Sequence, residues 1–425
     1  MKLCVIGTGY AGIVNAVGFA ALGNDVLCVD IDEKKVALIN SGKSPIFEPE
    51  LEEKLVAAFK QKKIHATTDL SAGIKDAEII FVSVGTPSKD DGSIDLKYIE
   101  SSAKSLGSAM KNRSYCVIIM KSTVVPGTTE GAFLKILEEE SGKKAGKSFG
   151  LSMCPEFLRE GHAVYDFFNP DRVVIGVSDK KAEALVVELH NPLKSKTLIT
   201  DIKTAEMIKY ASNAFLAVKV SFSNEIGNIC KKLGIDVYDV MKGVGMDARI
   251  SPHFLNAGAG FGGSCFPKDV KALVAKSKEL GYEPKLLDSA LELNKTQPLK
   301  LIELLKKHLK NLRGQKITIL GLAFKPETDD IREAPSLKII FEMIKEGADV
   351  IVYDPVAKNN VRQIFGDKIK YAETLKDALD FSKHILIVTE WNEFRDEKLY
   401  RGKIVIDGRK ALNKKTGGDY EGLCW

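Results

Sequence analysis

The chain has 425 residues, of which 44% are hydrophobic and 28% are charged, and its formal net charge is +5. These values are typical of a soluble globular protein with two or three domains and an ample apolar core. The small positive excess forms no basic tail or stripe, and no apolar run approaches the length of a membrane span. We therefore expect neither nucleic acid nor a membrane as a partner.

The seven cysteines include no pair at CxxC spacing, and several lie within apolar, strand-like runs. They are expected to be reduced core residues of a cytoplasmic protein. Because the sequence passes from Met1 and Lys2 directly into a predicted strand, we expect no signal peptide. The sequence has no zinc-type cluster of histidines and cysteines, so we expect no metal.

The first predicted elements form a dinucleotide-binding fingerprint: a strand over 2–6, a glycine turn, a helix to about residue 22 and a strand over 25–29. The turn reads Gly7-Thr8-Gly9-Tyr10-Ala11-Gly12. Gly7 makes the tight turn, Gly9 lets the backbone approach a pyrophosphate, and Gly12 allows the helix to pack on the strand. Asp30, after the second strand, is expected to accept hydrogen bonds from ribose hydroxyls and to repel a 2′-phosphate, which favours NAD over NADP.

Strands predicted over 78–84, 115–120, 149–153 and 172–177 complete a doubly wound sheet by about residue 199. Each ends in a polar loop of the kind that binds ligands in such sheets, and three of these loops are Gly85-Thr86-Pro87, Lys121-Ser122-Thr123 and Cys154-Pro155-Glu156. A single helix predicted over 202–233 is long enough to form a connecting spine and a dimer interface.

A second α/β unit begins at a predicted strand over 316–320, followed by Gly321-Leu322-Ala323-Phe324-Lys325 and a helix after Pro335. Further strands are predicted over 349–353, 384–388 and 403–406. The unit lacks the third fingerprint glycine, so we expect it to hold a different nucleotide-like ligand. The predicted fold class is therefore α/β, with two Rossmann-like doubly wound domains (1–199 and 297–425) joined by a long central helix and a helical middle domain (200–296).

The middle domain contains the stretch Phe261-Gly262-Gly263-Ser264-Cys265-Phe266-Pro267-Lys268-Asp269. Pro267 opens a helix predicted over 268–280, so Cys265 lies at a helix N-terminus, where the helix dipole and Lys268 favour the thiolate. The glycines let a ligand approach the backbone closely. A nucleophilic cysteine is one interpretation and a small buried hydrophobe is the other, and this stretch alone leaves both open.

Three pairs of polar residues stand at i,i+4 spacing: Lys209 with Asn213, Glu156 with Glu160, and Cys265 with Asp269. The first pair is suited to donate to an oxyanion, and the second to act as a general base and a substrate clamp. Solvated surface is the alternative for any one pair. With NAD and a nucleophile, the set indicates oxidation beyond a carbonyl: a thiolate adds to an aldehyde, a second hydride leaves, and water hydrolyses the thioester.

In their order, these motifs resemble the UDP-glucose/GDP-mannose dehydrogenase family over nearly the whole chain. The motifs that carry the resemblance are Gly7-Thr8-Gly9-Tyr10-Ala11-Gly12, Ser83-Val84-Gly85-Thr86-Pro87, Lys121-Ser122-Thr123, Pro155-Glu156-Phe157-Leu158-Arg159-Glu160-Gly161, Lys209-Tyr210 with Asn213, residues 261–269, and Phe324-Lys325-Pro326 with Asp329-Asp330-Ile331-Arg332-Glu333. The departures are Asn15, where we expect a small hydroxyl residue or alanine, a long loop over 141–148, and Ser251-Pro252-His253 before the substrate segment, which bears on the role of Arg249.

The resemblance implies roles for the catalytic residues. Cys265 matches the nucleophile, and Lys209 and Asn213 match the oxyanion-stabilising pair. Asp269 matches an acid that orders the catalytic water, and Thr123 a polar residue near that water and the nicotinamide. Glu156 and Glu160 match two carboxylates, one of which assists hydrolysis.

It also implies the binding positions. Those for NAD are Gly7, Gly9, Tyr10, Ala11, Gly12, Asp30, Lys35, Thr86, Thr123, Glu160, Lys268 and Arg332. Those for the substrate are Glu156, Phe157, Leu158, Arg159, Glu160, Lys209, Asn213, Arg249, Phe254, Leu255, Asn256, Ala257, Gly258, Gly262, Lys325 and Arg409. Arg249 resembles an arginine lent across a dimer.

The activity implied is a four-electron oxidation of a nucleotide sugar's primary alcohol to a carboxylate, using two NAD⁺, in a homodimer or higher homo-oligomer. Residues 266–267 and 325–330 favour UDP-glucose as the substrate, with GDP-mannose or a UDP-N-acetylhexosamine as the alternative. Two other classes stay open: a one-step β-hydroxyacid dehydrogenase, and a catalytically silent sensor of sugar nucleotides.

Overall fold

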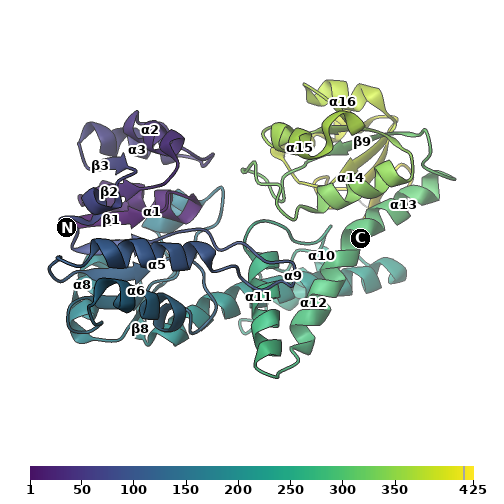
Figure 1. Ribbon diagram of the computed structural model, residues 1–425. Coiled ribbons are helices and arrows are strands. Elements are labelled where there is room, and N and C mark those ends of the chain that lie inside the picture. Colours follow the sequence, from purple (N-terminus) through teal and green to yellow (C-terminus); the bar gives the residue numbers. More distant parts are fainter. Residues whose placement is uncertain (415–416) are drawn as a thin grey trace. The chain divides into compact units, whose positions relative to one another are not determined.

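The computed structural model describes residues 1–414 and 417–425 (Figure 1). The chain divides into two compact units, 1–212 and 213–425, and the boundary falls inside the long helix α9 (Ile202–Leu233). The helix has the bounds that the sequence predicts. The division into three domains at residues 199 and 296 stays a prediction.

The first unit is a doubly wound α/β layer structure around a sheet with the strand order β3-β2-β1-β4-β5-β6-β7-β8. Its strands are β1 (Lys2–Ile6), β2 (Asp25–Val29), β3 (Ile64–Thr67), β4 (Ile79–Val82), β5 (Val117–Met120), β6 (Gly150–Met153), β7 (Val173–Val177) and β8 (Thr197–Thr200). Its helices are α1 (Tyr10–Ala21), α2 (Glu33–Asn40), α3 (Leu51–Lys60), α4 (Leu70–Ile74), α5 (Lys97–Ala109), α6 (Leu134–Ser141), α7 (Ala163–Phe168) and α8 (Lys180–His190). Only the pair β6–β7 is antiparallel among the described strands.

The central strands of this sheet are buried on both faces because helices cover both. Side chains alternate between the two faces of a strand, so Phe81 packs in one apolar layer and its neighbour Ile80 in the other. Ile119 and Ile118 of β5 divide in the same way. This double burial is the reason that the central strands read as continuous apolar runs.

The second unit carries a parallel sheet with the order β11-β10-β9-β12-β13-β14, the same order as the first six strands of the first sheet. Its strands are β9 (Lys316–Leu320), β10 (Asp349–Tyr353), β11 (Lys370–Tyr371), β12 (His384–Ile387), β13 (Ile404–Asp407) and β14 (Tyr420–Gly422). Its remaining helices are α10 (Val237–Gly245), α11 (Phe266–Glu279), α12 (Lys285–Thr296), α13 (Lys300–His308), α14 (Pro335–Lys345), α15 (Lys358–Phe365) and α16 (Leu375–Phe381). The predicted fold class, two Rossmann-like domains with a helical middle region, is confirmed.

The sequence pattern misses the outermost strands of both sheets, β3, β8, β11 and β14. An edge strand is covered on fewer sides, so it lacks the continuous apolar run of a central parallel strand. Strand β8 shows this most clearly, since Thr197, Leu198 and Ile199 are exposed.

Candidate active site

The glycine turn after β1 has the geometry that a dinucleotide requires. Gly7 has a φ of +91°, and a Cβ on Gly12 would lie 1.9 Å from the Gly7 carbonyl oxygen, so neither position admits a side chain. A Cβ on Gly9 would meet nothing within 4 Å, which leaves room for a ligand to approach. Gly9 is also the N-cap of α1 and supplies no capping side chain, so the first N–H groups of the helix face outward for an anion.

Asp30 follows β2 and points its carboxylate back at this turn. Oδ2 accepts from the backbone N–H of Thr8 at 2.7 Å and from its hydroxyl at 2.6 Å, and Oδ1 accepts from the N–H of Asp32 at 3.0 Å. Partial burial by itself raises the pKa of Asp30, but the hydrogen bonds from Thr8 and Asp32 outweigh it and hold the pKa below its usual value. Lys35 lies 4.0 Å away. The ionised carboxylate and the open turn fit NAD.

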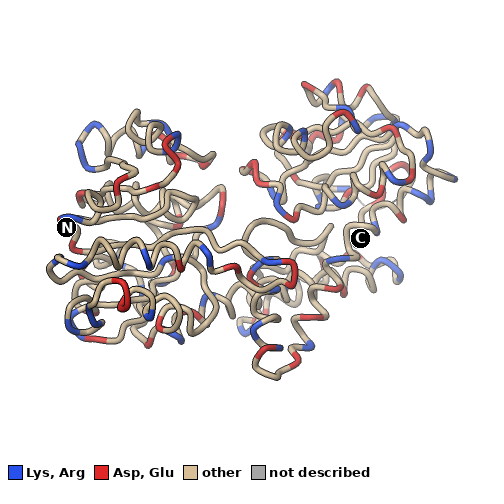
Figure 2. Tube along the Cα trace, viewed as in Figure 1, with Lys and Arg blue, Asp and Glu red and all other residues tan. Residues whose placement is uncertain are grey.

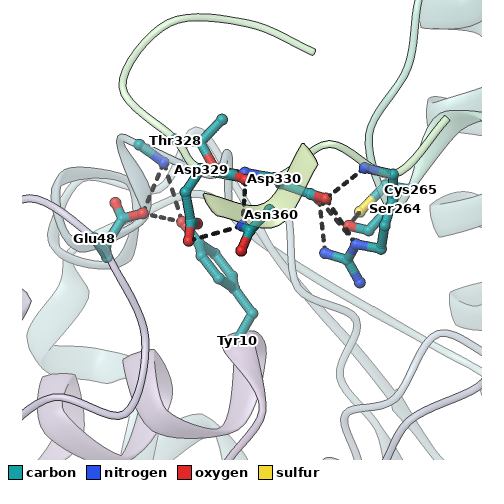
Figure 3. A network of polar contacts seen from close by, with 10 residues as sticks. Tyr10, Glu48, Ser264, Cys265, Thr328, Asp329, Asp330 and Asn360 are labelled. Atoms are coloured by element: carbon teal, nitrogen blue, oxygen red, sulfur yellow. Dashed lines mark hydrogen bonds and ion pairs between the residues drawn. The ribbon is translucent and has the colours of Figure 1, made fainter. Parts of the chain in front are cut away.

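A buried glutamate that the sequence interpretation does not single out ties α1 to the segment around residue 160 (Figure 3). The Tyr10 hydroxyl donates to Glu48, and the backbone N–H groups of Gly161 and Ala163 each donate to the Glu48 carboxylate at 2.7 Å. Burial and this hydrogen bond raise the pKa of Tyr10. Glu48 stands between apolar residues and a proline with no helical or strand periodicity, so no sequence signal points to this role.

Lys209 and Glu156 form a buried ion pair. The Lys209 ammonium lies 3.0 Å from Glu156 Oε1, and the two side chains are only 4% and 11% exposed. The exposed-lysine alternative for this position is therefore wrong. Burial opposes ionisation of Glu156, but Lys209 and the N–H of Leu158, 2.6 Å from Oε2, lower the pKa of the carboxyl group below its usual value.

A second lysine, Lys121 at the end of β5, lies in the same electrostatic environment. It is buried, and its backbone N–H donates to the carbonyl oxygen of Val82 at 2.9 Å. Among the described residues its side chain forms no hydrogen bond or ion pair. Burial lowers its pKa, as does Lys209, whereas Cys154 and Glu156 raise it. The motif at 121–123 therefore contributes a buried cation as well as the predicted Thr123, which is partly exposed.

The backbone over residues 154–159 has no regular secondary structure, so Glu156 and Glu160 do not share a helical face. The i,i+4 argument fails for this pair because Pro155 and the extended backbone around it direct the two side chains separately. Glu160 is buried near Tyr10. Arg159 is held by Asp166, with a charged contact at 2.5 Å.

In the second unit, Asp269 is the centre of a buried polar group at the start of α11. Asn213 on α9 donates to Oδ2 at 2.6 Å, and the Lys268 ammonium lies 2.6 Å from Oδ1. Asp269 is 1% exposed, so these charge-assisted bonds hold it firmly. Asn213 lies four residues after Lys209 on the same helix, as predicted, and one of the two belongs to each compact unit.

Cys265 is the N-cap of α11, with Pro267 in the first turn, as predicted. None of the seven cysteines, all of which the structure describes, forms a disulfide, and six are buried whereas Cys265 is partly exposed. Burial raises the pKa of Cys4 and of Cys424 to about 12, which makes those thiols inert. The partial exposure of Cys265 thus favours the nucleophile interpretation over the buried-hydrophobe alternative.

The two glycines before Cys265 are required by packing within the protein. A Cβ on Gly262 would lie 2.5 Å from the Glu333 carbonyl oxygen, and a Cβ on Gly263 would lie 2.9 Å from the Phe324 ring. Protein atoms therefore occupy the Cβ positions of both glycines, and the expectation that a ligand approaches their backbone stays a prediction. The absence of a Cβ lets the cysteine loop lie against the loop after β9.

Arg409, which follows β13, contacts several segments that carry predicted substrate positions. Its guanidinium donates to the carbonyl oxygens of Val388 at 3.1 Å, Gly260 at 2.9 Å and Phe324 at 3.4 Å. A Cβ on Gly258 would lie 3.3 Å from the Arg409 side chain. The structure thus brings together Arg409, the segment 254–258 and the loop that carries Lys325.

The remaining predicted positions are placed singly. The Arg249 side chain is 89% exposed, and its guanidinium pairs with the nearby Asp247 at 2.6 Å. Arg332 lies 2.7 Å from Asp330 beside an open hollow of about 360 Å³ that Asp329, Asn360 and Ile364 also line. Thr86 and Phe157 are partly exposed, and the Arg172 guanidinium lies 3.8 Å above the Phe157 ring. Whether these residues bind ligands stays a prediction.

A Rossmann sheet whose glycine turn and following carboxylate fit NAD, next to a buried lysine–glutamate pair, defines a class, the NAD-dependent dehydrogenases. Models of one family in this class match three segments: the NAD binding domain at 1–194, the central domain at 203–296 and the UDP binding domain at 318–414. The chain belongs to the UDP-glucose/GDP-mannose dehydrogenase family.

Relatives that match the chain over its full length support the same family assignment. The chain is 45% identical to the UDP-glucose 6-dehydrogenase AglM of Haloferax volcanii over 100% of both chains, and 41% identical to the UDP-glucose 6-dehydrogenase TuaD of Bacillus subtilis over 97% of this chain and 90% of that one. A solved UDP-glucose dehydrogenase from Pyrobaculum islandicum superposes with a TM-score of 0.95 at 39% identity, covering 100% of this chain and 98% of that one.

Proposed function

We propose that the chain is an NAD-dependent UDP-glucose 6-dehydrogenase, which oxidises the C6 alcohol of UDP-glucose to the carboxylate of UDP-glucuronate and releases two NADH. The observation that carries this proposal is the partly exposed Cys265 at the start of α11, four residues before a buried Asp269 that Asn213 and Lys268 hold. A dehydrogenase that stops at the carbonyl needs no such thiol.

In the first oxidation, a carboxylate of the 156–160 segment takes the hydroxyl proton while C6 loses a hydride. The Lys209 ammonium stabilises the negative charge that develops on the substrate oxygen, and its burial strengthens this interaction. The glycine turn and Asp30 would hold NAD⁺, which would supply the hydride acceptor for each of the two oxidations.

In the second oxidation, the Cys265 thiolate adds to the aldehyde carbon, and the resulting thiohemiacetal oxyanion accepts hydrogen bonds from Lys209 and Asn213. Loss of a hydride from that carbon leaves a thioester. Water positioned by Asp269 attacks the thioester carbonyl, the carbon–sulfur bond breaks, and the sulfur leaves as the thiolate. The products are the sugar carboxylate and the regenerated Cys265.

The second sheet is proposed to hold the nucleotide diphosphate. Arg409 and Lys325 supply cations at loops that follow β13 and β9, at the carboxyl edge of the sheet where ligands bind in this architecture. Elsewhere along both units Lys and Arg are interspersed with Asp and Glu, without a basic stripe (Figure 2).

The decisive test is NADH stoichiometry with a panel of nucleotide sugars. We expect two NADH per UDP-glucose, and stalled turnover in Cys265→Ser. Activity only with GDP-mannose or a UDP-N-acetylhexosamine would move the substrate assignment within the family. One NADH per substrate with full activity in Cys265→Ser would indicate one-step chemistry, and no turnover with any sugar would indicate a sensor.

The proposed assembly is a homodimer through α9. Phe215, Phe222 and Ile229 on this helix are 64%, 47% and 50% exposed and repeat every seven residues, so they form one apolar stripe. Phe222→Asp should shift the protein to a smaller species in sedimentation velocity. Phe341→Asp, at an exposed phenylalanine of α14 outside the stripe, is the control that should leave the assembly intact.

We also propose a cytoplasmic location, supported by seven described cysteines of which none forms a disulfide. In the described part of the chain, no helix combines the length and apolarity that a membrane span needs.

A further inference from the structure

The two sheets repeat the same turn at the same register. In the first, the N–H of Gly7 donates to the carbonyl oxygen of Val29 at 2.8 Å, and in the second, the N–H of Gly321 donates to that of Tyr353 at 2.9 Å. The two glycines have φ values of +91° and +87°. The residue after each acceptor is an aspartate, Asp30 or Asp354. Asp354 therefore occupies the position that binds ribose in a dinucleotide fold.

The hydrogen bonds of the two aspartates differ. Asp30 accepts three, two of them from Thr8, so one of the four lone pairs of its carboxylate stays available for a ribose hydroxyl. Asp354 is 2% exposed and accepts five, two at Oδ1 and three at Oδ2. The donors are the N–H groups of Val356 (3.0 Å), Ala357 (2.9 Å), Leu322 (2.7 Å) and Ala323 (3.1 Å) and the indole N–H of Trp391 (3.1 Å). The carboxylate of Asp354 is saturated and cannot accept from a ligand.

We propose that Asp354, with the indole of Trp391, is a positioning residue that fixes the loop 321–325 for the nucleotide half of the substrate. The ribose-binding position of a dinucleotide fold serves here as an internal clamp. The inference rests on the proposed function, in which Lys325 of this loop contacts the diphosphate.

The carbonyl oxygens of the loop 321–325 are held as well as its N–H groups, so hydrogen bonds fix the position of the loop from both sides. The Ser336 hydroxyl donates to the carbonyl oxygen of Leu322 at 2.5 Å, and the Thr389 hydroxyl donates to that of Ala323 at 2.6 Å. Asp354 holds the N–H groups of the same two residues. Trp391 and Thr389 both follow β12, so the clamp joins the loops after β9, β10 and β12 at one edge of the sheet.

The test measures the KM values of both substrates in Asp354→Asn. The amide places an NH₂ group against N–H donors, so two or more of the five bonds are lost. We expect the KM for UDP-glucose to rise about tenfold or more, while the KM for NAD changes less than about twofold and kcat less than about threefold. A purely structural role would lower the active fraction and leave both KM values unchanged.

Trp391→Phe removes only the indole N–H that donates to Asp354. This milder variant tests the same proposal if Asp354→Asn does not fold. Its KM for UDP-glucose should rise about three- to tenfold. The matched control is Trp425→Phe, which removes a buried indole whose N–H bonds the Tyr420 hydroxyl at 3.1 Å, away from the loop 321–325. Phenylalanine keeps an aromatic ring beside Tyr238 and removes only a bond to Tyr420, so this variant should leave both KM values unchanged.

Binding is read directly from fluorescence, because the chain has only two tryptophans. In Trp425→Phe, the emission comes from Trp391 alone and should change on addition of UDP. Adding Asp354→Asn should move the midpoint of that titration to about tenfold higher UDP. Equal midpoints, or a KM for UDP-glucose that Asp354→Asn leaves unchanged, overturn the clamp, whereas absence of wild-type turnover with UDP-glucose overturns the proposed function instead.

Discussion

Replacing Glu156 with glutamine should destabilise the protein more than replacing its partner Lys209 with methionine. The buried cluster of Lys121, Lys209 and Glu156 carries two ammonium groups and one carboxylate, a net charge of one positive unit. Glu156→Gln raises this to two by removing the carboxylate that pairs with Lys209. Lys209→Met lowers it to zero and leaves Glu156 near Lys121.

The magnitude follows from burial, since the ion-pair side chains are 4% and 11% exposed and solvent screens them little. Removing one partner of a buried pair costs about 3–5 kcal/mol. We expect Glu156→Gln near the upper end. Lys209→Met should cost about 2–3 kcal/mol, because the carboxylate keeps the N–H of Leu158 at 2.6 Å and the field of Lys121.

The deficit of Glu156→Gln should depend on pH. Burial already lowers the pKa of Lys121, and Glu156 opposes this effect, so loss of the carboxylate lowers the pKa of Lys121 further. The pKa of this lysine is then lower in the folded state than in the unfolded state. At pH values between these two pKa values, the folded state binds fewer protons than the unfolded state. Stability therefore rises with pH in that window, and the deficit relative to wild type should shrink from pH 7 to pH 9.

The assay is urea denaturation of wild type, both single variants and the double variant at pH 7 and pH 9. Glu138→Gln is the control, because its partner Lys144 lies at 2.6 Å but is 70% exposed, so its loss should cost below about 1 kcal/mol. A cost for Glu156→Gln no larger than the control, or a double variant whose cost equals the sum of the two singles, would refute the reasoning.

Three further predictions concern single buried contacts. Asp269→Asn should lower kcat about 100-fold, because the amide loses its ion pair and turns its own NH₂ toward Asn213 or Lys268; initial rates of NADH formation measure this, and near-wild-type kcat would exclude a role for the carboxylate. Burial raises the pKa of Glu206, which accepts two backbone N–H bonds from the loop after β5. The folded state then binds more protons, so wild-type stability should fall as pH rises through that pKa. Denaturation midpoints should show this slope weakened in Glu206→Gln. Gly12→Ala should raise the KM for NAD about tenfold, since its Cβ would displace the Gly7 turn, while an unchanged KM would show that the turn adapts.

Much of the fold could be predicted because its signals are local. Residues buried on both faces of a sheet form apolar runs, the glycine turn needs Gly7 and Gly12 for steric reasons within a few residues, and α9 shows an uninterrupted helical pattern. The edge strands could not be predicted because half-exposed strands lose that signal.

Part of the candidate site could likewise be predicted from the sequence, and part could not. Residue types and spacing identify Cys265 at a helix start and Lys209 with Asn213 on one helix, because helix geometry alone relates them. Partners distant in sequence could not be assigned: Glu48 binds the segment at 161–163 across more than a hundred residues.

The sequence by itself therefore determines the order of the elements, the turn that fits NAD and the identity of the reactive side chains. Tertiary structure decides which charges meet. It places Glu156 against Lys209 and saturates Asp354, although Asp30 and Asp354 look alike in sequence. The physical reason is that ion pairing and burial depend on distances between loops of separate strands, which no local pattern encodes.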